Sequence, residues 1–343
     1  MRVGLFHFYS LTYGGGGERF ITELATYLSS RGYAVEVHTL PWGRGEAPIE
    51  LPSDVLYCEK PVHRVRVDVA YYMYTPLTPH LFFCSAPKVA GLHAPVVAEE
   101  HPSAIDSFRQ GPHVFAAFLA RRFAVPGHLR MFDAVHIVMQ ARVAHPRVFF
   151  LPNWVDCSHR DQALQARERK PSKFYVLYVG KPSYIKGFSR FVELRRLIDG
   201  EDIEFVATVP PDSLAPGDGN IKCLGMVPHQ QIWDLYAKAA VLVHPTRRET
   251  FGRVIIEALA SGAPVVTTNL PAHTMLGLPL EYASTVQEMA TRIHELYTEW
   301  TGDYSAYLAR SRRLADEVSK YDAATLLPQY EAMLTTVANE PST

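Results

Sequence analysis

Short apolar runs, rich in β-branched and aromatic residues, alternate with stretches of helical periodicity along the whole chain. Such continuous apolar runs predict parallel strands in a sheet that helices cover on both faces. In the first half the predicted strands are RVGLFHFY, AVEVHTL, VDVAYY, KVAGLHA, AVHIVMQ and RVFFLPN. In the second half they are FYVLYVG, IEFVATV, NIKCLGM, AAVLVHP and APVVTTN. The pattern predicts an α/β fold in which a doubly wound sheet occurs twice.

The alternation breaks near LPNWVDCSHRDQALQARERKPSK, where the strand signal fails and charged residues cluster. We therefore predict one Rossmann-like domain over residues 1–156 and a second over residues 157–318. Residues 319–343 contain a helical pattern, YDAATLLPQYEAMLTTVA, which we expect to pack back toward the first domain. Two doubly wound domains that face each other leave a central cleft at the carboxyl ends of their strands, where the ligands of such sheets bind.

Composition and charge narrow the class of protein. The chain has 343 residues, of which 48% are hydrophobic and 20% charged, as in ordinary globular proteins with two domains. A formal net charge of −1 gives no general attraction to nucleic acid, so we expect no nucleic-acid partner. No apolar run approaches the ~20 residues of a membrane helix, so we expect a cytoplasmic protein. Four widely spaced cysteines without C-x-x-C predict buried thiols in a reducing compartment: Cys58, Cys84, Cys157 and Cys223.

Two glutamates bracket an apolar stretch in RRETFGRVIIEALASG. Glu249 precedes the predicted helix, and Glu257 lies about one and a half turns further along it. A helix that is apolar on every face is a buried one, so Glu257 is not simply a solvated charge. The helix dipole could account for Glu249, and an internal partner could account for Glu257. We favour ligand hydroxyls for both, because a sugar or a ribose offers them to a carboxylate.

The second domain opens with FYVLYVGKPSYIKGF, in which Gly180 ends a strand and two lysines follow it. Lys181 and Lys186 then lie on a loop at the carboxyl end of that strand, where ammonium groups can neutralise a diphosphate. Two solvated surface lysines are the alternative, since most lysines are exposed.

Glycines and a histidine provide further candidates in the first domain. The run of Gly14, Gly15, Gly16 and Gly17 separates the first strand from a helix, and backbone amides there can approach a phosphate. The spacing matches neither G-x-G-x-x-G nor the P-loop, and a flexible turn is the alternative. His93 follows a predicted strand in KVAGLHAPVV, where a structural role is the ordinary explanation. No close ligand cluster indicates a metal, and we expect no cofactor beyond a co-substrate.

Together these motifs resemble the retaining glycosyltransferases of family 4, which have the two-domain GT-B fold. The stretch from Glu249 to Glu257 fits the family's E-x7-E motif, and EALASGAPVV resembles the E-A-[ML]-A-x-G-x-P-V-V that follows it. VGKPSYIKGF matches V-G-R-x-x-x-x-K-G, LPNWVD matches I-P-N-G-V-D, and GGGGERF is similar to G-G-x-E-R. The resemblance extends over about residues 2–335 and rests on the order in which several motifs occur.

The resemblance implies a role for each matching residue. Glu249 would hold hydroxyls of the donor sugar, and Glu257 would hold the ribose of a UDP- or GDP-sugar. Lys181 and Lys186 would hold the diphosphate, helped by the amides of Gly14 to Gly17. His93 would lie by the transferred sugar. The remaining implied donor-binding residues are Gly180, Thr250, Phe251 and Gly252.

Members of the family retain the anomeric configuration and need no bound metal. A front-face mechanism is usually proposed for them, in which the departing diphosphate accepts the proton of the acceptor hydroxyl. This chain departs from the family pattern at Lys181, where arginine is commoner, and at Trp154, where glycine is usual. Both departures bear on the nucleotide site, because arginine and lysine bind phosphate in different geometries.

The acceptor is left open by the sequence as a glycan, a lipid-linked glycan or a small molecule. Residues 113–132 mix phenylalanines with arginines, a composition that suits peripheral contact with the inner face of a membrane. A core-facing helix with its arginines in solvent explains the same pattern and is the favoured reading.

Other functions fit the motifs less well. An epimerase or phosphorylase of the same fold leaves the co-occurrence of E-x7-E and V-G-K-x-x-x-x-K-G unexplained. A nicotinamide dehydrogenase fails on the glycine spacing. The main alternative is a non-catalytic GT-B protein that binds a nucleotide sugar or a partner glycosyltransferase, and nucleotide binding without turnover would identify it.

Overall fold

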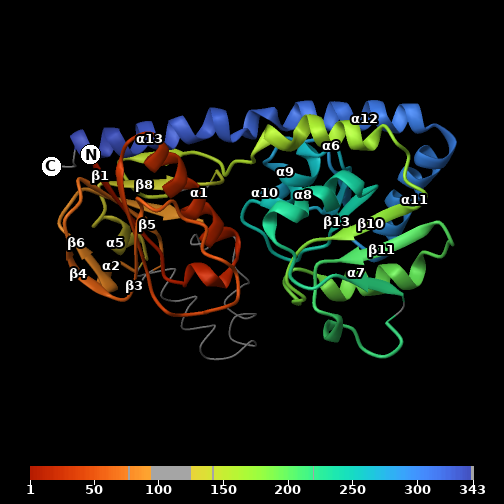
Figure 1. The fold of residues 1–343 in the computed structure, drawn as a ribbon, viewed down its shortest axis with the longest axis horizontal. Coiled ribbons are helices and arrows are strands. Elements are labelled where there is room, and N and C mark those ends of the chain that lie inside the picture. The colour runs from red at the N-terminus through yellow and green to blue at the C-terminus, as the bar shows by residue number, and fades with distance from the viewer. Residues whose placement is uncertain (76–77, 94–124, 141–142, 219, 341–343) are drawn as a thin grey trace. The chain divides into compact units, whose positions relative to one another are not determined.

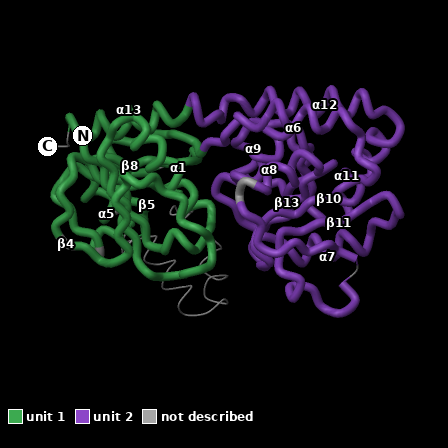
Figure 2. The backbone as a smooth tube through the Cα atoms, in the orientation of Figure 1, with its two compact units in different colours: residues 1–153, 326–343 green, residues 154–325 purple. Residues whose placement is uncertain are grey.

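The computed structural model describes residues 1–75, 78–93, 125–140, 143–218 and 220–340. The chain divides into two compact units (Figure 2). Unit 1 contains Met1–Asn153 and Leu326–Thr343, and unit 2 contains Trp154–Thr325. The C-terminal helix therefore belongs to unit 1 from Leu326 onward, although it is far from that unit in the sequence.

Unit 1 contains a seven-stranded sheet in the order β3-β2-β1-β5-β7-β8-β9, and every pairing in it is parallel. Its strands are β1 Arg2–Phe6, β2 Ala34–Thr39, β3 Leu56–Glu59, β5 Val69–Met73, β7 Lys88–Leu92, β8 Ala134–Ile137 and β9 Val148–Phe150. A short parallel pair lies beside it, formed by β4 Val62–Val65 and β6 Phe82–Cys84. The described helices of this unit are α1 Gly16–Ser30, α2 Thr78–Leu81, α5 Val125–Leu129 and most of α13 Ala323–Asn339.

Helices cover both faces of this sheet (Figure 1). The ring of Phe20 in α1 lies 5.5 Å from that of Tyr330 in α13, so these two helices share one face. On the other face Leu129 of α5 packs into an apolar cluster with strand residues such as Tyr72 and Val135. The pattern of the sequence required this arrangement, because β5, β7 and β8 are buried on both sides.

Unit 2 contains a six-stranded parallel sheet in the order β12-β11-β10-β13-β14-β15. Its strands are β10 Phe174–Tyr178, β11 Ile203–Ala207, β12 Ile221–Cys223, β13 Val241–His244, β14 Val265–Thr268 and β15 Glu281–Ala283. Its helices are α6 Arg160–Arg167, α7 Phe188–Leu197, α8 His229–Lys238, α9 Arg253–Ala260, α10 Pro271–Thr274, α11 Val286–Gly302 and α12 Tyr304–Glu317. On one face α7 and α11 form the main apolar core with the strands, and on the other α6, α8, α9 and α12 pack together (Figure 1).

The predicted α/β class and the two doubly wound sheets are confirmed, and each strand predicted from an apolar run is present. The strands that the sequence pattern missed are β3, β4, β6 and β15. In β3, β4 and β15 a charged residue interrupts or ends the apolar run, which leaves no continuous strand signal. The expectation of four buried cysteines is wrong in part: all four are free thiols, but only Cys84 is buried and the others are partly exposed.

Candidate functional site

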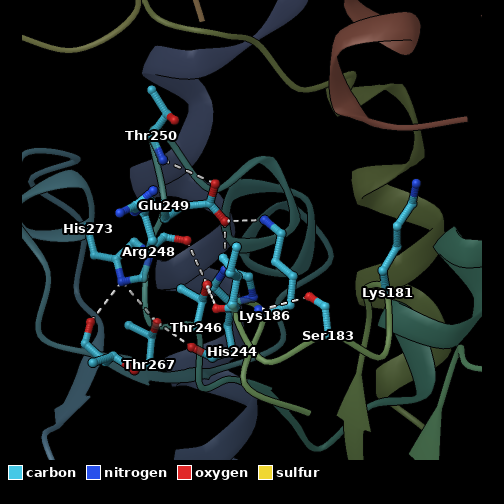
Figure 3. Close-up of polar contacts among 12 residues, drawn as sticks. Lys181, Ser183, Lys186, His244, Thr246, Arg248, Glu249, Thr250, Thr267 and His273 are labelled. Atoms are coloured by element: carbon cyan, nitrogen blue, oxygen red, sulfur yellow. Dashed lines mark hydrogen bonds and ion pairs between the residues drawn. The ribbon is translucent and has the colours of Figure 1, made fainter. Parts of the chain in front are cut away.

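Glu249 and Lys186 meet at the carboxyl ends of two neighbouring strands in unit 2 (Figure 3). Glu249 lies in the loop between β13 and α9, and Lys186 lies in the loop between β10 and α7. Because β10 and β13 pair in parallel, their carboxyl ends lie at the same edge of the sheet. The ammonium of Lys186 donates to Oε2 of Glu249 at 2.8 Å, although the two residues are 63 positions apart.

Two further groups hold the carboxylate of Glu249. His244, the last residue of β13, places Nε2 at 3.1 Å from Oε2, and the Thr250 amide donates to Oε1 at 3.1 Å. The side chain of Glu249 is only 14% exposed. Burial by itself raises the pKa of this carboxyl, but the hydrogen bond from His244 and the charge of Lys186 outweigh it and hold the pKa far below its usual range. Glu249 is therefore ionised at neutral pH and accepts hydrogen bonds only.

Two buried polar residues, Thr267 and His273, lie beside His244 (Figure 3). Thr267 in β14 donates its hydroxyl to the carbonyl of His244 at 2.9 Å. The ring of His273 places Nδ1 at 2.8 Å from the Thr268 carbonyl and 3.1 Å from the Thr267 hydroxyl. Burial lowers the pKa of His273 to about 4, so this ring is neutral and Nδ1 carries its hydrogen.

The two loops that carry Lys186 and Glu249 are also joined through their backbones. The amide of Arg247 donates to the carbonyl of Ile185 at 2.8 Å, and the hydroxyl of Thr246 lies 2.9 Å from the same oxygen. Gly187 follows Lys186 with φ +74°, and a β carbon there would lie 2.0 Å from the carbonyl oxygen of Pro245. Only glycine allows so close an approach in this backbone conformation.

Lys181 does not join this group of side chains. It is exposed on the same loop as Lys186, but its side chain extends away from Glu249 (Figure 3). The amide of Gly180 donates to the hydroxyl of Thr208 at 3.3 Å, so the turn after β10 is anchored to the end of β11. The structure thus brings one of the two predicted lysines to the predicted glutamate.

Glu257 lies inside α9, with 2% of its surface exposed. The hydroxyl of Tyr236 in α8 donates to its Oε2 at 3.1 Å, and Nε of Arg253 lies 3.9 Å from Oε1. Arg253 in turn lies over the ring of the buried Trp154, at 5.9 Å. The carboxylate that the sequence assigned to a ribose therefore has partners inside the protein, and Trp154 is connected to it through Arg253.

The remaining residues of the E-x7-E segment shape the start of α9. Phe251 is buried, and its ring lies 5.7 Å from that of Tyr321. Gly252 is the N-cap of the helix, with φ +85°. This conformation explains the Phe-Gly pair in physical terms, because the aromatic ring anchors the loop and the glycine makes the turn into the helix.

The glycine run of unit 1 is built around Glu18. Gly14 ends a short 3-10 turn in the left-handed region with φ +67°, and Gly15 is the N-cap of α1. The amide of Gly15 donates to Oε2 of Glu18 at 2.7 Å, while Oε1 of Glu18 lies 2.5 Å from Nε2 of His7. An internal carboxylate thus already complements the start of α1, which the sequence pattern alone did not suggest.

His93 directly follows β7 in unit 1, as predicted from its position after an apolar run, and it is half-buried. Its Nε2 is 2.6 Å from the hydroxyl of Tyr71, which is also 2.7 Å from Nδ1 of the buried His136. The ring of Phe20 lies 4.2 Å from that of His93. These contacts fix the orientation of the imidazole.

Across the described ranges, no group of three or more His, Cys, Asp or Glu side chains is arranged to hold a metal ion. Within the same residues no helix is long and apolar enough to cross a membrane. Most of the segment proposed for membrane contact, residues 113–124, lies outside the part of the chain that the structure describes.

Sequence reasoning missed His244, Tyr236 and Arg253 as partners of the two glutamates. The sequence did contain a signal for His244. A histidine that ends an apolar strand immediately before a charged loop is placed close to the charged side chains of that loop. Tyr236 gave no such signal, because its contact with Glu257 depends on how α8 packs on α9.

Comparisons with known proteins show what this chain is similar to. Residues 173–299 match the family model described as Glycosyl transferases group 1. The O-antigen chain mannosyltransferase B of Escherichia coli is 43% identical over 53 residues, which are 16% of this chain and 14% of that protein. The matched segments cover less than a third of the length of the curated relatives.

Solved structures match the chain over almost its full length. Sucrose-phosphate synthase from Thermosynechococcus elongatus has a TM-score of 0.73 at 15% identity, covering 98% of this chain and 99% of that one. Anabaena HepE in complex with UDP and glucose has a TM-score of 0.71 at 16% identity, covering 98% of this chain and 100% of that one. The chain therefore has the GT-B fold, and its segment 173–299 is similar to the group 1 glycosyltransferases.

Proposed function

We propose that this chain is a retaining glycosyltransferase that moves a sugar from a nucleoside-diphosphate donor, UDP- or GDP-linked, to an acceptor hydroxyl. The observation that carries the proposal is the pairing of Glu249 with Lys186, within the segment that is similar to group 1 glycosyltransferases. A carboxylate accepts hydrogen bonds from sugar hydroxyls, and an ammonium neutralises phosphate oxygens. The sugar of the donor would thus bind Glu249, and its diphosphate would bind Lys186.

The reaction breaks the bond between the anomeric carbon and the diphosphate oxygen. A new bond forms between that carbon and the acceptor oxygen on the same face of the sugar, and the leaving diphosphate takes the proton of the acceptor hydroxyl. Negative charge grows on the leaving group as the first bond breaks. Lys186 and Lys181 would stabilise that charge and so take the part that a bound metal would otherwise have.

The remaining roles follow the resemblance of the motifs. Glu257 would hold the ribose, while Gly180 and the segment Thr250–Gly252 would form the rest of the donor site in unit 2. In unit 1, His93 would lie by the transferred sugar and amides of the glycine run would help to bind phosphate. The UDP and glucose present in the HepE structure support a nucleotide sugar as the donor. The similarity of one segment to the O-antigen chain mannosyltransferase B of Escherichia coli supports a glycan or lipid-linked glycan as the acceptor.

Thermal unfolding tests the donor assignment directly. The melting temperature would be measured with UDP, GDP, ADP and their sugars, in the presence of a chelator. A ligand that binds only the native protein stabilises it by mass action and so raises the melting temperature. At a hundredfold excess over Kd the free energy of unfolding rises by about 2.7 kcal/mol. We expect one nucleotide class to stand out; no response to any of them would count against the proposal.

Two matched variants then test the role of the carboxylate. Glu249→Gln keeps the size of the side chain but removes its charge, and we expect transfer to be lost while nucleoside diphosphate still binds. The control is Glu204→Gln in β11, whose carboxylate pairs with Lys173 at 3.4 Å and Lys222 at 3.8 Å. If both variants transferred sugar at the parental rate, Glu249 would have no part in the reaction.

A further inference from the structure

Among the residues that the structure describes, three hydrogen-bond donors reach the carboxylate of Glu249, and they are divided unequally between its oxygens. Oε2 lies within reach of Lys186 Nζ at 2.8 Å and His244 Nε2 at 3.1 Å, while Oε1 accepts the amide of Thr250 at 3.1 Å. An ionised carboxylate offers about four acceptor positions. The remaining position is therefore on Oε1, and a single ligand hydroxyl can occupy it.

The two partners of Oε2 differ in how firmly they are held. The Lys186 side chain is 36% exposed and ends a flexible stem, whereas the His244 side chain is 3% exposed. Thr267 bonds the backbone of His244 at 2.9 Å, and the ring of His273 packs 5.6 Å from that of His244. A diphosphate attracts Lys186, but nothing comparable can draw a buried neutral ring away.

We propose that His244 is the positioning residue for Glu249, which keeps Oε2 in place when the diphosphate of the donor draws Lys186 away. Oε1 then continues to face the sugar, and the donor site keeps its geometry when the ammonium of Lys186 moves from Glu249 to the diphosphate. This inference rests on the proposed function, since it concerns how the same site accommodates a nucleotide sugar. His244 is not itself assigned a contact with the sugar.

The charges around His244 are consistent with this role. Burial lowers the pKa of His244, the carboxylate of Glu249 opposes that effect, and the ammonium of Lys186 adds to it. The neighbouring His273 is neutral. A neutral His244 that donates to Glu249 must carry its hydrogen on Nε2, so it contributes a hydrogen bond without adding a positive charge that would compete with Lys186 for the diphosphate.

The experiment compares His244→Gln, whose amide can still donate, with His244→Phe, which fills the space without a donor. The control is Tyr307→Phe, which removes a buried 2.8 Å hydrogen bond to the Ala240 carbonyl in the same unit. The first measurement needs no ligand: the titration of the Glu249 carboxyl, followed by carbon NMR with labelled glutamate. The second is the ratio of Kd for a nucleoside diphosphate to Kd for its sugar.

We expect His244→Phe to raise the pKa of the Glu249 carboxyl and to reduce the Kd ratio by about tenfold, the worth of one hydrogen bond to a charged group. Binding of the diphosphate alone should change less than about twofold, and His244→Gln should restore the parental ratio. Tyr307→Phe should lower stability and leave both measurements unchanged.

Each other result counts against a different step. If His244→Phe leaves the carboxyl titration unchanged, the contact with Glu249 is not made in solution and the inference fails. If the titration changes but the Kd ratio does not, His244 has only a structural role. If the parent chain binds no nucleotide at all, the proposed function fails and the positioning role fails with it, while the titration still reports whether the contact exists.

Discussion

Replacing Gly187 by alanine tests whether the two loops of the donor site depend on close backbone contact. Gly187 follows Lys186 with φ +74°, and its added β carbon would lie 2.0 Å from the carbonyl oxygen and 2.6 Å from the carbonyl carbon of Pro245. Ordinary van der Waals contact begins near 3.4 Å, so the backbones must separate by more than about 1 Å. These two atoms belong to the backbone of Pro245, so they cannot move aside as the end of a flexible side chain can.

Gly225 provides a matched control for this substitution. It lies in the same unit with the same φ of +74°, but a β carbon added there meets no atom within 4 Å. Alanine at either position is disfavoured in the left-handed region by about 1–2 kcal/mol. Stiffening of the unfolded chain by alanine is also shared by the two variants, so the difference between them isolates the contact with Pro245.

The size of that difference can be worked out from the hydrogen bonds that separation would break. The amide of Arg247 and the hydroxyl of Thr246 both bond the carbonyl of Ile185, and each such bond contributes about 0.5–1.5 kcal/mol. With the strain of repacking added, Gly187→Ala should cost about 2–4 kcal/mol more than Gly225→Ala. For a unit of this size the extra loss corresponds to a melting temperature lower by about 5–15 °C.

The assay is thermal unfolding of both variants, alone and with the nucleotide that binds the parent. Gly225→Ala should retain the parental shift on adding nucleotide, and Gly187→Ala should lose most of it because Lys186 moves with the loop. Equal melting temperatures for the two variants would refute the reasoning, since they would show that the loops yield without cost.

Three further predictions concern buried polar groups. Arg167→Met should cost at least about 3 kcal/mol of unfolding free energy, because the buried guanidinium donates to three carbonyls at 2.6–2.8 Å and all three hydrogen bonds would be lost. Arg169→Met, at an exposed position, should cost less than about 0.5 kcal/mol by denaturant titration. Burial lowers the pKa of His136 from 6.5 to about 4, against the opposing hydrogen bond to the Leu151 carbonyl. The contribution of this ring to the free energy of unfolding is therefore complete above pH 6.5 and is lost as the pH falls toward 4. Urea titrations at several pH values should show a loss of up to about 3 kcal/mol that is smaller in His136→Gln, and parallel pH profiles would contradict this. Tyr236→Phe should cost about 1.5–3 kcal/mol by removing the hydroxyl that donates to the buried Glu257, and a neutral effect in thermal unfolding would show that another group replaces it.

Several features of the site could be read from neighbouring residues alone. The burial of α9 follows from its apolar residues on every face, and all six positions from Ile255 to Ala260 are buried. The end of that helix follows from Gly262, which has φ +75° as a C-terminal glycine should. The lysines of the loop after β10 could be placed for the same reason, because strand and helix signals on either side leave no other position for them.

Other features depend on which segments become neighbours. Lys186 and Lys181 are equivalent by sequence, yet only Lys186 bonds Glu249, because the loop turns back at Gly187 against Pro245. The internal partner of Glu18 at the glycine run is His7, from the end of β1, and no local pattern pairs these residues. The assignment of C-terminal residues to unit 1 likewise depends on long-range packing, such as the contact of Tyr330 with the Leu151 carbonyl at 3.0 Å.

The sequence by itself determined most of the elements of this protein, since the period of apolar residues, helix-stop glycines and strand-end loops are properties of adjacent residues. It also determined that charged groups follow the carboxyl ends of strands in the second unit. Only the tertiary structure decided which charges meet, because the order β10-β13-β14 places Lys186, Glu249, His244 and His273 at one edge of the sheet. That order is set by the packing of whole strands and helices, and a buried carboxylate is stable there because three donors reach it at once.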